Sequence, residues 1–224
     1  DCPVLTAPSR ATLHALIEAL PVPAWKPSRK HTWTTLDVDE DVTATEVVPN
    51  QRRRFRQGND AQNNFMREWL AHRLQTLDPS RTVTELFAGS GNFTEVIAAR
   101  GFQQIYAVEG VEDSVATLNA RGFPATTGLY HNLFIAPECE KLQAATAQAS
   151  ILVLDPPRDG CKHLPALLPK KHRYRDVFYI ACDVATFSRD LQALIAAGLT
   201  VKELQPLDLF PQTPHVELLC WLTR

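Results

Sequence analysis

Apolar positions along residues 82–222 fall into short β-branched and aromatic runs that alternate with segments of helical spacing. The runs predict strands at residues 82–87, 104–108, 150–154 and 178–181, and the segments between them predict helices at residues 92–99, 111–120 and 188–197. Residues 200–208 and 216–222 form a closing pair of strands, which the short connection over residues 210–215 makes antiparallel. This alternation predicts an α/β fold with a mainly parallel sheet covered on both faces.

The first 51 residues differ from this pattern and predict a small separate lobe. Helical spacing over residues 9–20 predicts a helix with Ser9 as its cap. Its apolar face consists of Leu13, Leu16, Ile17 and Leu20. Prolines then break the pattern, and β-branched segments at residues 32–36 and 42–48 predict a two-stranded element. We therefore expect a lobe of residues 1–51 and a larger domain of residues 52–224.

A second amphipathic helix is predicted over residues 60–77, ahead of the first strand of the sheet. Its apolar face consists of Phe65, Trp69, Leu70 and Leu74. The helix ends at Asp78 and Pro79, because proline does not fit inside a helix.

The composition of the 224 residues, with 45% hydrophobic and 21% charged residues, is that of a globular protein. No stretch approaches the roughly 18 unbroken apolar residues of a membrane span, and the first residues lack the pattern of a signal peptide. We therefore expect a cytoplasmic monomer without a membrane partner. The five cysteines are scattered without a CxxC pair, and neither His131 nor His215 has metal-ligand spacing, so we predict no metal site.

Two basic clusters interleaved with aromatic residues lie at residues 52–56 and 170–175. Lysine and arginine suit a phosphate backbone, and aromatic rings stack on splayed bases. The clusters therefore suit a single-stranded nucleic acid, although solvated faces of neighbouring elements explain either cluster equally well.

A glycine-rich turn over residues 84–94 (TELFAGSGNFT) joins the first predicted strand to the next helix. Gly89 and Gly91 let the backbone pass close to a ligand, and the helix start at Asn92 offers unpaired N–H groups. The turn is neither a P-loop nor a complete GxGxxG motif. Eighteen residues after Gly91 the second strand ends at Glu109, whose carboxylate suits the ribose hydroxyls of an adenosine. Turn and acid together predict an adenosine-containing cofactor.

Two further strands end in residues that suggest chemistry. Residues 155–158 (DPPR) follow one strand, and their two prolines form a rigid, donor-poor edge against which a flat base can lie. That edge favours S-adenosylmethionine over NAD. Cys182 follows the strand at residues 178–181, at the edge where open α/β sheets place their chemistry, and we predict that it is a nucleophile. A small buried thiol at a strand end is the alternative.

Four motifs together resemble those of the RNA 5-methyluridine methyltransferases of the tRNA and 23S rRNA type. They are residues 86–94 (LFAGSGNFT), residues 155–158 (DPPR), residues 181–183 (ACD) with 188–191 (SRDL), and residues 210–217 (FPQTPHVE), in matching order and spacing. The resemblance implies a Rossmann-like S-adenosylmethionine-dependent methyltransferase fold over residues 52–224. It also implies methylation of carbon 5 of a uridine in RNA.

The resemblance implies roles for individual positions. Cys182 would be the nucleophile, Glu217 the base that removes a proton, and Asp155 a catalytic or substrate-holding acid. The cofactor-binding residues that we predict are Gln57, Phe87, Gly89, Gly91, Asn92, Glu109, Asn132 and Asp155.

The chemistry of uracil agrees with these residue types. Carbon 5 is a poor nucleophile, so a thiolate must first add to carbon 6, and cysteine is the best side-chain nucleophile near neutral pH. The methylated adduct then carries an acidic proton at carbon 5, which a carboxylate must remove before the thiolate leaves. A flipped or single-stranded uridine is implied, because a stacked helix closes both faces of carbon 6.

The chain departs from the family pattern in two places. Asp183 stands where many relatives carry asparagine, and its charge would raise the pKa of Cys182. Relatives commonly bear an N-terminal RNA-binding barrel, and some hold an iron–sulfur cluster on four cysteines. Cys2 resembles the last of those four, and we expect no cluster because one cysteine cannot hold it.

These departures leave a minimal enzyme and a fragment as alternatives. A non-catalytic RNA-binding module that keeps the fold is a further one. An RNA cytosine-5 methyltransferase fits the sequence less well, because that class usually places a cysteine beside the proline that corresponds to Pro156.

Overall fold

The structure is a computed structural model that describes residues 5–27, 32–51, 59–168, 172–208, 213 and 216–224. The chain divides into two compact units, residues 1–60 and residues 61–224. Several features singled out in the sequence lie outside the described residues, among them Gln57, Cys2, His215 and the basic cluster at residues 52–56.

The N-terminal unit contains helix α1 (Ala7–Glu18) and the short 3-10 helix η1 (Pro23–Trp25). The prediction that Ser9 caps the first helix is wrong, because the N-cap is Thr6, whose side chain accepts a hydrogen bond from the Ser9 N–H. The predicted apolar face is also only partly correct. Leu16 is buried, whereas Ile17 and Leu20 are more than half exposed.

The two-stranded element predicted for this unit does not occur among its described residues. Instead, the Thr43 N–H donates to the Glu46 carboxylate at 2.9 Å, and the Glu46 N–H donates back to the Thr43 carbonyl at 3.0 Å. These bonds close a turn in the middle of the second predicted strand. In the first predicted strand, the Thr35 carbonyl accepts a hydrogen bond from the Asn50 N–H at 2.8 Å, and the Thr35 N–H donates to the Asn50 side chain at 3.1 Å.

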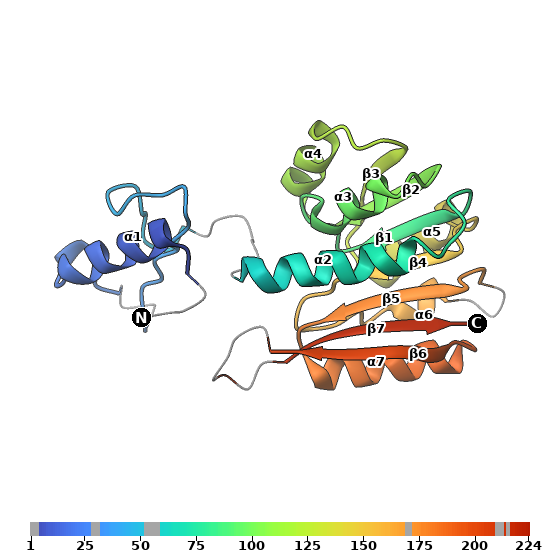
Figure 1. The fold of residues 1–224 in the computed structure, drawn as a ribbon. Helices are drawn as coiled ribbons and strands as arrows, with labels where there is room; N and C mark the ends of the chain where they lie inside the picture. Colours follow the sequence, from blue (N-terminus) through green and yellow to red (C-terminus); the bar gives the residue numbers. More distant parts are fainter. Residues whose placement is uncertain (1–4, 28–31, 52–58, 169–171, 209–212, 214–215) are drawn as a thin grey trace. The chain divides into compact units, whose positions relative to one another are not determined.

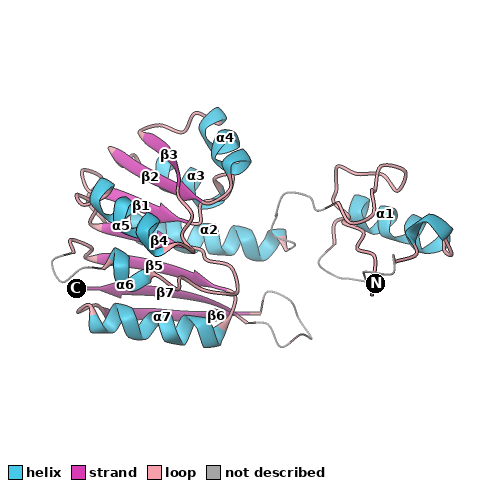
Figure 2. Ribbon diagram, turned by 180° about the vertical axis from the view of Figure 1, so that it is seen from behind, coloured by secondary structure: helices cyan, strands magenta, loops and turns pink. Residues whose placement is uncertain are grey.

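The larger unit is built on one sheet with helices on both faces (Figure 1; Figure 2). Its strands are β1 (Thr82–Leu86), β2 (Gln104–Glu109), β3 (Thr126–Tyr130), β4 (Ile151–Leu154), β5 (Asp176–Ala181), β6 (Thr200–Leu207) and β7 (Glu217–Thr223). Its helices are α2 (Asp60–Leu74), α3 (Asn92–Ala99), α4 (Glu112–Ala120), α5 (Ala136–Ala145), α6 (Leu164–Leu167) and α7 (Val184–Ala196).

The sheet order is β3-β2-β1-β4-β5-β7-β6, and β7 runs antiparallel to both of its neighbours while the other pairs are parallel. The predicted parallel sheet with an antiparallel closing pair is therefore confirmed. The helix predicted over residues 60–77 ends earlier, at Leu74. Its predicted face is wrong at Phe65, which is 43% exposed, because the neighbouring Met66 is buried instead.

Strand β5 shows why the centre of the sheet reads as an unbroken apolar run. Val177, Tyr179 and Ala181 pack into one cluster with residues of α5, α6 and α7. Phe178 and Ile180 pack into the opposite cluster with residues of α2 and α3. A strand buried on both faces carries apolar residues on both of its faces, here from Val177 to Ala181, so the usual alternation with polar residues disappears.

Candidate active site

The three predicted catalytic residues lie at one edge of the sheet, on three adjacent strands. Asp155 follows β4 and Cys182 follows β5. Glu217 is the first residue of β7, and because β7 is antiparallel to β5, its start lies at the same edge as the ends of β4 and β5. In α/β sheets of this kind, ligands bind outside the carboxyl ends of the strands, beside the point where the strand order reverses. Here that point lies between β1 and β4.

The thiol of Cys182 is half-buried and donates a weak hydrogen bond to the carbonyl of Pro156, with 3.8 Å between sulfur and oxygen. Burial, followed by the charges of Glu217 and Asp155, raises the pKa of Cys182 to about 11. The guanidinium of Arg158 acts in the opposite direction. The free protein therefore holds this residue mainly as a neutral thiol near neutral pH.

The pKa values of the two carboxyl groups of the site are both raised toward neutral pH. Glu217 is only 4% exposed, and burial raises its pKa to about 7, against the opposing charge of Arg158. Burial and then the charge of Glu217 raise the pKa of Asp155 to about 8. Near neutral pH the edge thus holds a mostly protonated Asp155 beside a Glu217 carboxyl group that is about half ionised. Carboxyl groups whose pKa values lie near the working pH are typical of acid–base chemistry.

Asp183 does not act on the nucleophile as the sequence predicts. It is the N-cap of α7, and its carboxylate accepts a hydrogen bond from the Thr186 N–H at 2.8 Å. This bond lowers the pKa of Asp183. The carboxylates that raise the pKa of Cys182 are instead Glu217 and Asp155.

The predicted cofactor turn runs over residues 87–92, between β1 and α3. Its backbone is unusual: Phe87 has a φ of 61° although it is not glycine, and Gly91 has a φ of 102°. A Cβ atom on Gly91 would lie 2.7 Å from the ring of Phe123, so only glycine fits there. The glycine predicted to allow a close approach of the backbone is thus required by packing against this ring.

Glu109 ends β2 beside this turn and accepts three backbone hydrogen bonds. They come from the N–H groups of Gly89 at 2.9 Å, Gly110 at 2.8 Å and Val111 at 2.9 Å. A carboxylate has about four acceptor positions, so about one is left for a ligand hydroxyl without rearrangement. The predicted bond to both ribose hydroxyls would therefore require a shared acceptor position.

The other predicted cofactor residues divide between two environments. Phe87 lies beside Phe134, with 6.1 Å between the ring centroids, and Asn132 accepts a hydrogen bond from the Phe134 N–H. The side chain of Asn92 is bonded to α2, because its amide donates to Asn63 at 2.9 Å and its oxygen accepts from Arg67 at 3.1 Å. Asn92 thus holds the turn against α2 in this structure.

The interpretation of the sequence assigned no role to Glu85, a buried acid on β1. It is 2% exposed, it accepts a hydrogen bond from the Thr94 hydroxyl at 2.6 Å, and burial raises its pKa to about 8. The signal was present in the sequence as a single acidic residue inside an otherwise neutral strand. The hydrogen bond between Glu85 on β1 and Thr94 on α3 joins the two elements that the turn connects.

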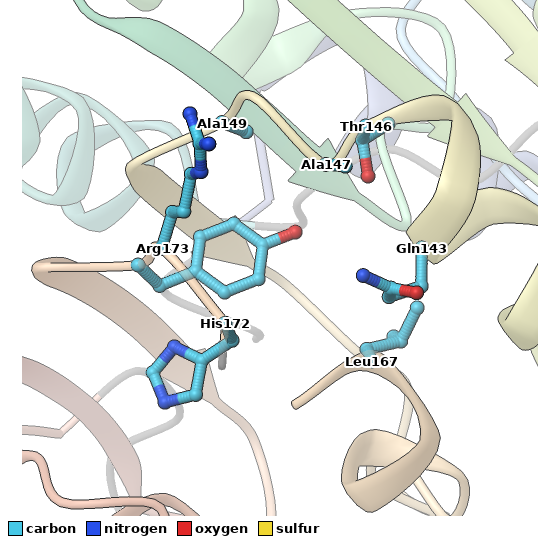
Figure 3. Close-up of a pocket in the computed structure, with 8 residues that line it drawn as sticks. Gln143, Thr146, Ala147, Ala149, Leu167, His172 and Arg173 are labelled. Atoms are coloured by element: carbon cyan, nitrogen blue, oxygen red, sulfur yellow. The ribbon is translucent and has the colours of Figure 1, made fainter. Parts of the chain in front are cut away.

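The second basic cluster lies at the other edge of the sheet, where β5 begins. There His172, Arg173 and Tyr174 line a small hollow with residues of α5 such as Gln143 (Figure 3). His172 is buried, with its Nε2 atom 3.0 Å from the Ala197 carbonyl, and Arg173 donates to Gln148. The described part of this cluster is therefore remote from Cys182, at the opposite end of the strand.

Among the described residues, no group of three or more histidine, cysteine, aspartate or glutamate side chains could hold a metal ion. His131 lies 3.0 Å from the carboxylate of Glu138, and His215 falls outside the described residues. None of the described helices is both long and apolar enough to cross a membrane.

Residues 139–224 match the family described as tRNA (Uracil-5-)-methyltransferase, and this range contains Asp155, Cys182 and Glu217. Over 223 residues the chain is 39% identical to a protein of Nitrosomonas europaea described as an uncharacterized RNA methyltransferase. The aligned part makes up 97% of this chain and 56% of the relative. It is also 39% identical over 170 residues to the 23S rRNA (uracil(1939)-C(5))-methyltransferase RlmD of Halomonas elongata, covering 73% of this chain and 35% of the relative. The chain belongs to the RNA uracil-5-methyltransferase family.

This family member spans between about a third and somewhat more than half of the length of those two relatives. The chain resembles the tRNA (uracil-54, C5)-methyltransferase of Pyrococcus abyssi, solved with S-adenosyl-L-homocysteine, at a TM-score of 0.60 and 22% identity over 85% of this chain and 44% of that one. A putative RNA methyltransferase of Pyrococcus horikoshii has a TM-score of 0.53 at 15% identity, over 78% of this chain and 87% of that one. The predicted Rossmann-like fold of S-adenosylmethionine-dependent methyltransferases is confirmed.

Proposed function

We propose that this chain uses S-adenosylmethionine to methylate carbon 5 of a uridine in tRNA or 23S rRNA through a covalent adduct with Cys182. The observation that carries the proposal is the meeting of a thiol and two carboxyl groups on three adjacent strands, with Glu217 and Asp155 both acting on the pKa of Cys182. A nucleophile, an acid and a base are the three groups that this reaction needs.

In the first half of the proposed reaction, Cys182 loses its proton to solvent and its thiolate adds to carbon 6 of the uracil. The electrons of the 5,6 double bond move toward the carbonyl at carbon 4 and form an enolate. Asp155 is protonated near neutral pH, since its pKa is about 8, and it donates a hydrogen bond to the enolate oxygen. S-adenosylmethionine would supply the methyl group: the electron pair of the enolate would form the new bond at carbon 5, and the bond between sulfur and methyl would break to leave S-adenosylhomocysteine.

In the second half, Glu217 removes the proton that remains on carbon 5. The electron pair of that C–H bond restores the 5,6 double bond, and the bond between carbon 6 and sulfur breaks to release the thiolate of Cys182. A pKa of about 7 suits this step, because a base near the working pH is both ionised and strong enough to accept the proton.

The cofactor would lie across the ends of β1 and β2. Phe87, Gly89 and Gly91 supply the turn, Glu109 offers its remaining acceptor position to the ribose, and Asn132 lies at the end of the neighbouring strand β3. The relatives described as acting on 23S rRNA and on tRNA support RNA as the substrate.

The test uses RNA substituted with 5-fluorouridine, incubated with the protein and S-adenosylmethionine and run on a denaturing gel. Fluorine cannot be abstracted from carbon 5, so a working enzyme stalls as a covalent complex and gives a shifted band. The band must vanish for Cys182→Ala and persist for Cys220→Ala, a matched change at a buried thiol of β7.

Two other results would replace the proposal. No band from the wild-type protein, with S-adenosylmethionine binding intact, would identify a non-catalytic RNA-binding module. A band with RNA that carries 5-fluorocytidine, and none with 5-fluorouridine, would identify a cytosine methyltransferase.

A further inference from the structure

Helix α7 begins two residues after Cys182, and three of its side chains hold the loop that follows Asp155. The three bonds run from the Thr186 hydroxyl to the Arg158 carbonyl at 3.0 Å, from the Arg189 guanidinium to the Asp159 carbonyl at 3.0 Å, and from the Cys161 N–H to the Asp190 carboxylate at 2.6 Å. Backbone groups of three residues of one loop are thus fixed by neighbouring side chains on one face of a helix.

Asp190 has the most constrained position of the three. It is 2% exposed, and the oxygen that accepts from the Cys161 N–H also accepts from the Tyr179 hydroxyl at 2.6 Å. Its other oxygen accepts from Arg189 at 2.8 Å. Tyr179 lies on β5, the strand that carries Cys182, so one carboxylate oxygen joins that strand to the loop of Asp155.

Gly160 shows how closely the loop approaches the helix. Its φ is 68°, and a Cβ atom there would lie 2.6 Å from the Asp190 carboxylate and 2.5 Å from the Arg189 guanidinium. Any other residue would be strained at this φ and would have to displace the Asp190 carboxylate and the Arg189 guanidinium or move the loop away from α7. The contact is therefore specified by both partners, by a glycine on the loop and by a buried acid on the helix.

We propose that Asp190 is a positioning residue, which joins the loop of Asp155 to the strand of Cys182 and so sets the distance between acid and nucleophile. Asp155 and Pro156 stand at the start of this loop, and the Pro156 carbonyl contacts the Cys182 thiol. A loop released from α7 would uncover the thiol and remove the acid from its side. The inference rests on the proposed function and adds a residue to its machinery that does not touch the substrate.

The test measures how fast iodoacetamide alkylates each cysteine, read by mass spectrometry of the peptides, in Asp190→Asn and Tyr179→Phe. Both oxygens of the Asp190 carboxylate accept hydrogen bonds, and the amide nitrogen that replaces one of them in asparagine cannot accept. Asp159→Asn is the matched control, because it removes a charge from the same loop but loses only an exposed ion pair with Lys162. Alkylation needs neither RNA nor methyl donor, so a failure of the proposed function does not affect this result.

We expect Asp190→Asn to speed alkylation of Cys182 by about fivefold or more, because a less buried thiol ionises more readily. Tyr179→Phe should act in the same direction, and Asp159→Asn should have no effect. Cys220, fully buried in β7, should stay unreactive in every variant. An unchanged rate at Cys182, or equal rises at Cys182 and Cys220, would overturn the inference, because the second result means general unfolding.

The same variants give a catalytic readout where the wild-type protein forms the 5-fluorouridine adduct. Asp190→Asn should slow adduct formation about tenfold or more, while the dissociation constant for S-adenosylmethionine stays within about twofold of its wild-type value. An adduct that forms at the wild-type rate would overturn the positioning role. A smaller final amount of adduct formed at the wild-type rate would do the same, because it reports a loss of folded protein.

Discussion

The substitution Glu217→Gln should change the two halves of the proposed reaction in opposite directions. The pKa of Cys182 is raised from 9.0 to about 11, and Glu217 is the second cause after burial. Removing that charge should lower the pKa by about half a unit to one unit, which increases the thiolate fraction about three- to tenfold at alkaline pH. Iodoacetamide should therefore alkylate Cys182 faster in this variant. Asp183→Asn removes a charge one residue from Cys182 but should leave the alkylation rate unchanged, because the Asp183 carboxylate bonds to the start of α7 and does not raise the pKa of Cys182.

The pH dependence of the difference is the sharper test. Glu217 has a pKa of about 7 in the wild-type protein, so it is mostly protonated below about pH 6 and no longer opposes the thiolate. Wild-type and Glu217→Gln rates should converge there and separate above about pH 8. With ordinary RNA and S-adenosylmethionine, the variant should still form the adduct but release it slowly, because no base removes the proton from carbon 5. Equal effects of Glu217→Gln and Asp183→Asn on alkylation, or rapid release of fully methylated RNA, would refute this reasoning.

Three further predictions concern the framework around the site. Burial raises the pKa of Glu85 to about 8, so the folded protein keeps a proton that the unfolded chain loses above about pH 4.5, and stability falls as the pH rises. In Glu85→Gln, the free energy of unfolding should fall less steeply with pH, by about 1.4 kcal/mol per pH unit between about pH 5 and pH 8. Urea unfolding at several pH values measures this slope, and an equal slope in variant and wild type would show that Glu85 does not hold the proton. Gly160→Ala should destabilise the fold by about 2 kcal/mol or more. Gly101→Ala is the control and should cost about 1 kcal/mol, because Gly101 has a φ of 78° but open space around it. Equal losses of stability in thermal unfolding would contradict the tight contact of Gly160 with α7. Glu109→Gln should weaken S-adenosylmethionine binding about tenfold to a hundredfold in calorimetry, because the glutamine NH₂ group would face a backbone N–H group that now donates to the carboxylate. An unchanged affinity would remove Glu109 from the cofactor site.

The sheet and the position of its site could be predicted from the sequence for one physical reason. Strands buried on both faces, such as β4 and β5, appear as short unbroken apolar runs, and parallel strands bring their ends to a common edge. Cys182 and Asp155 follow such runs directly. Glu217 was harder to place, because a strand start at this edge depends on β7 being antiparallel, which the short connection to β6 indicated.

Elements with few buried residues were missed. Strand β3 lies at the edge of the sheet, contains a glycine and has no fully buried position, so it lacks an apolar run. Helix α5 buries only Cys139 and Leu142. The N-terminal unit was assigned strands because of its β-branched residues, but Thr43 and Glu46 hydrogen-bond to each other's backbone and form a turn.

Asp190 could not be found by periodicity, since an acid at an inward position of an amphipathic helix resembles a break in the pattern. Its partners, Cys161 and Tyr179, lie far from it in the sequence or on another element. Only the folded arrangement shows that its charge is surrounded by donors. Buried polar groups of this kind depend on long-range contacts, which a single sequence does not specify.

The raised pKa of Cys182 also has a consequence for the lifetime of the protein. Oxidation by peroxide proceeds through the thiolate, as substrate attack does. With a pKa of about 11, only about one molecule in ten thousand carries the thiolate near neutral pH. With a lower pKa, a partly exposed cysteine in this position would be oxidised readily by peroxide. Burial and the acidic surroundings that hold Cys182 as a neutral thiol therefore also protect it from oxidation, and under the proposed function they keep the nucleophile intact between encounters with RNA.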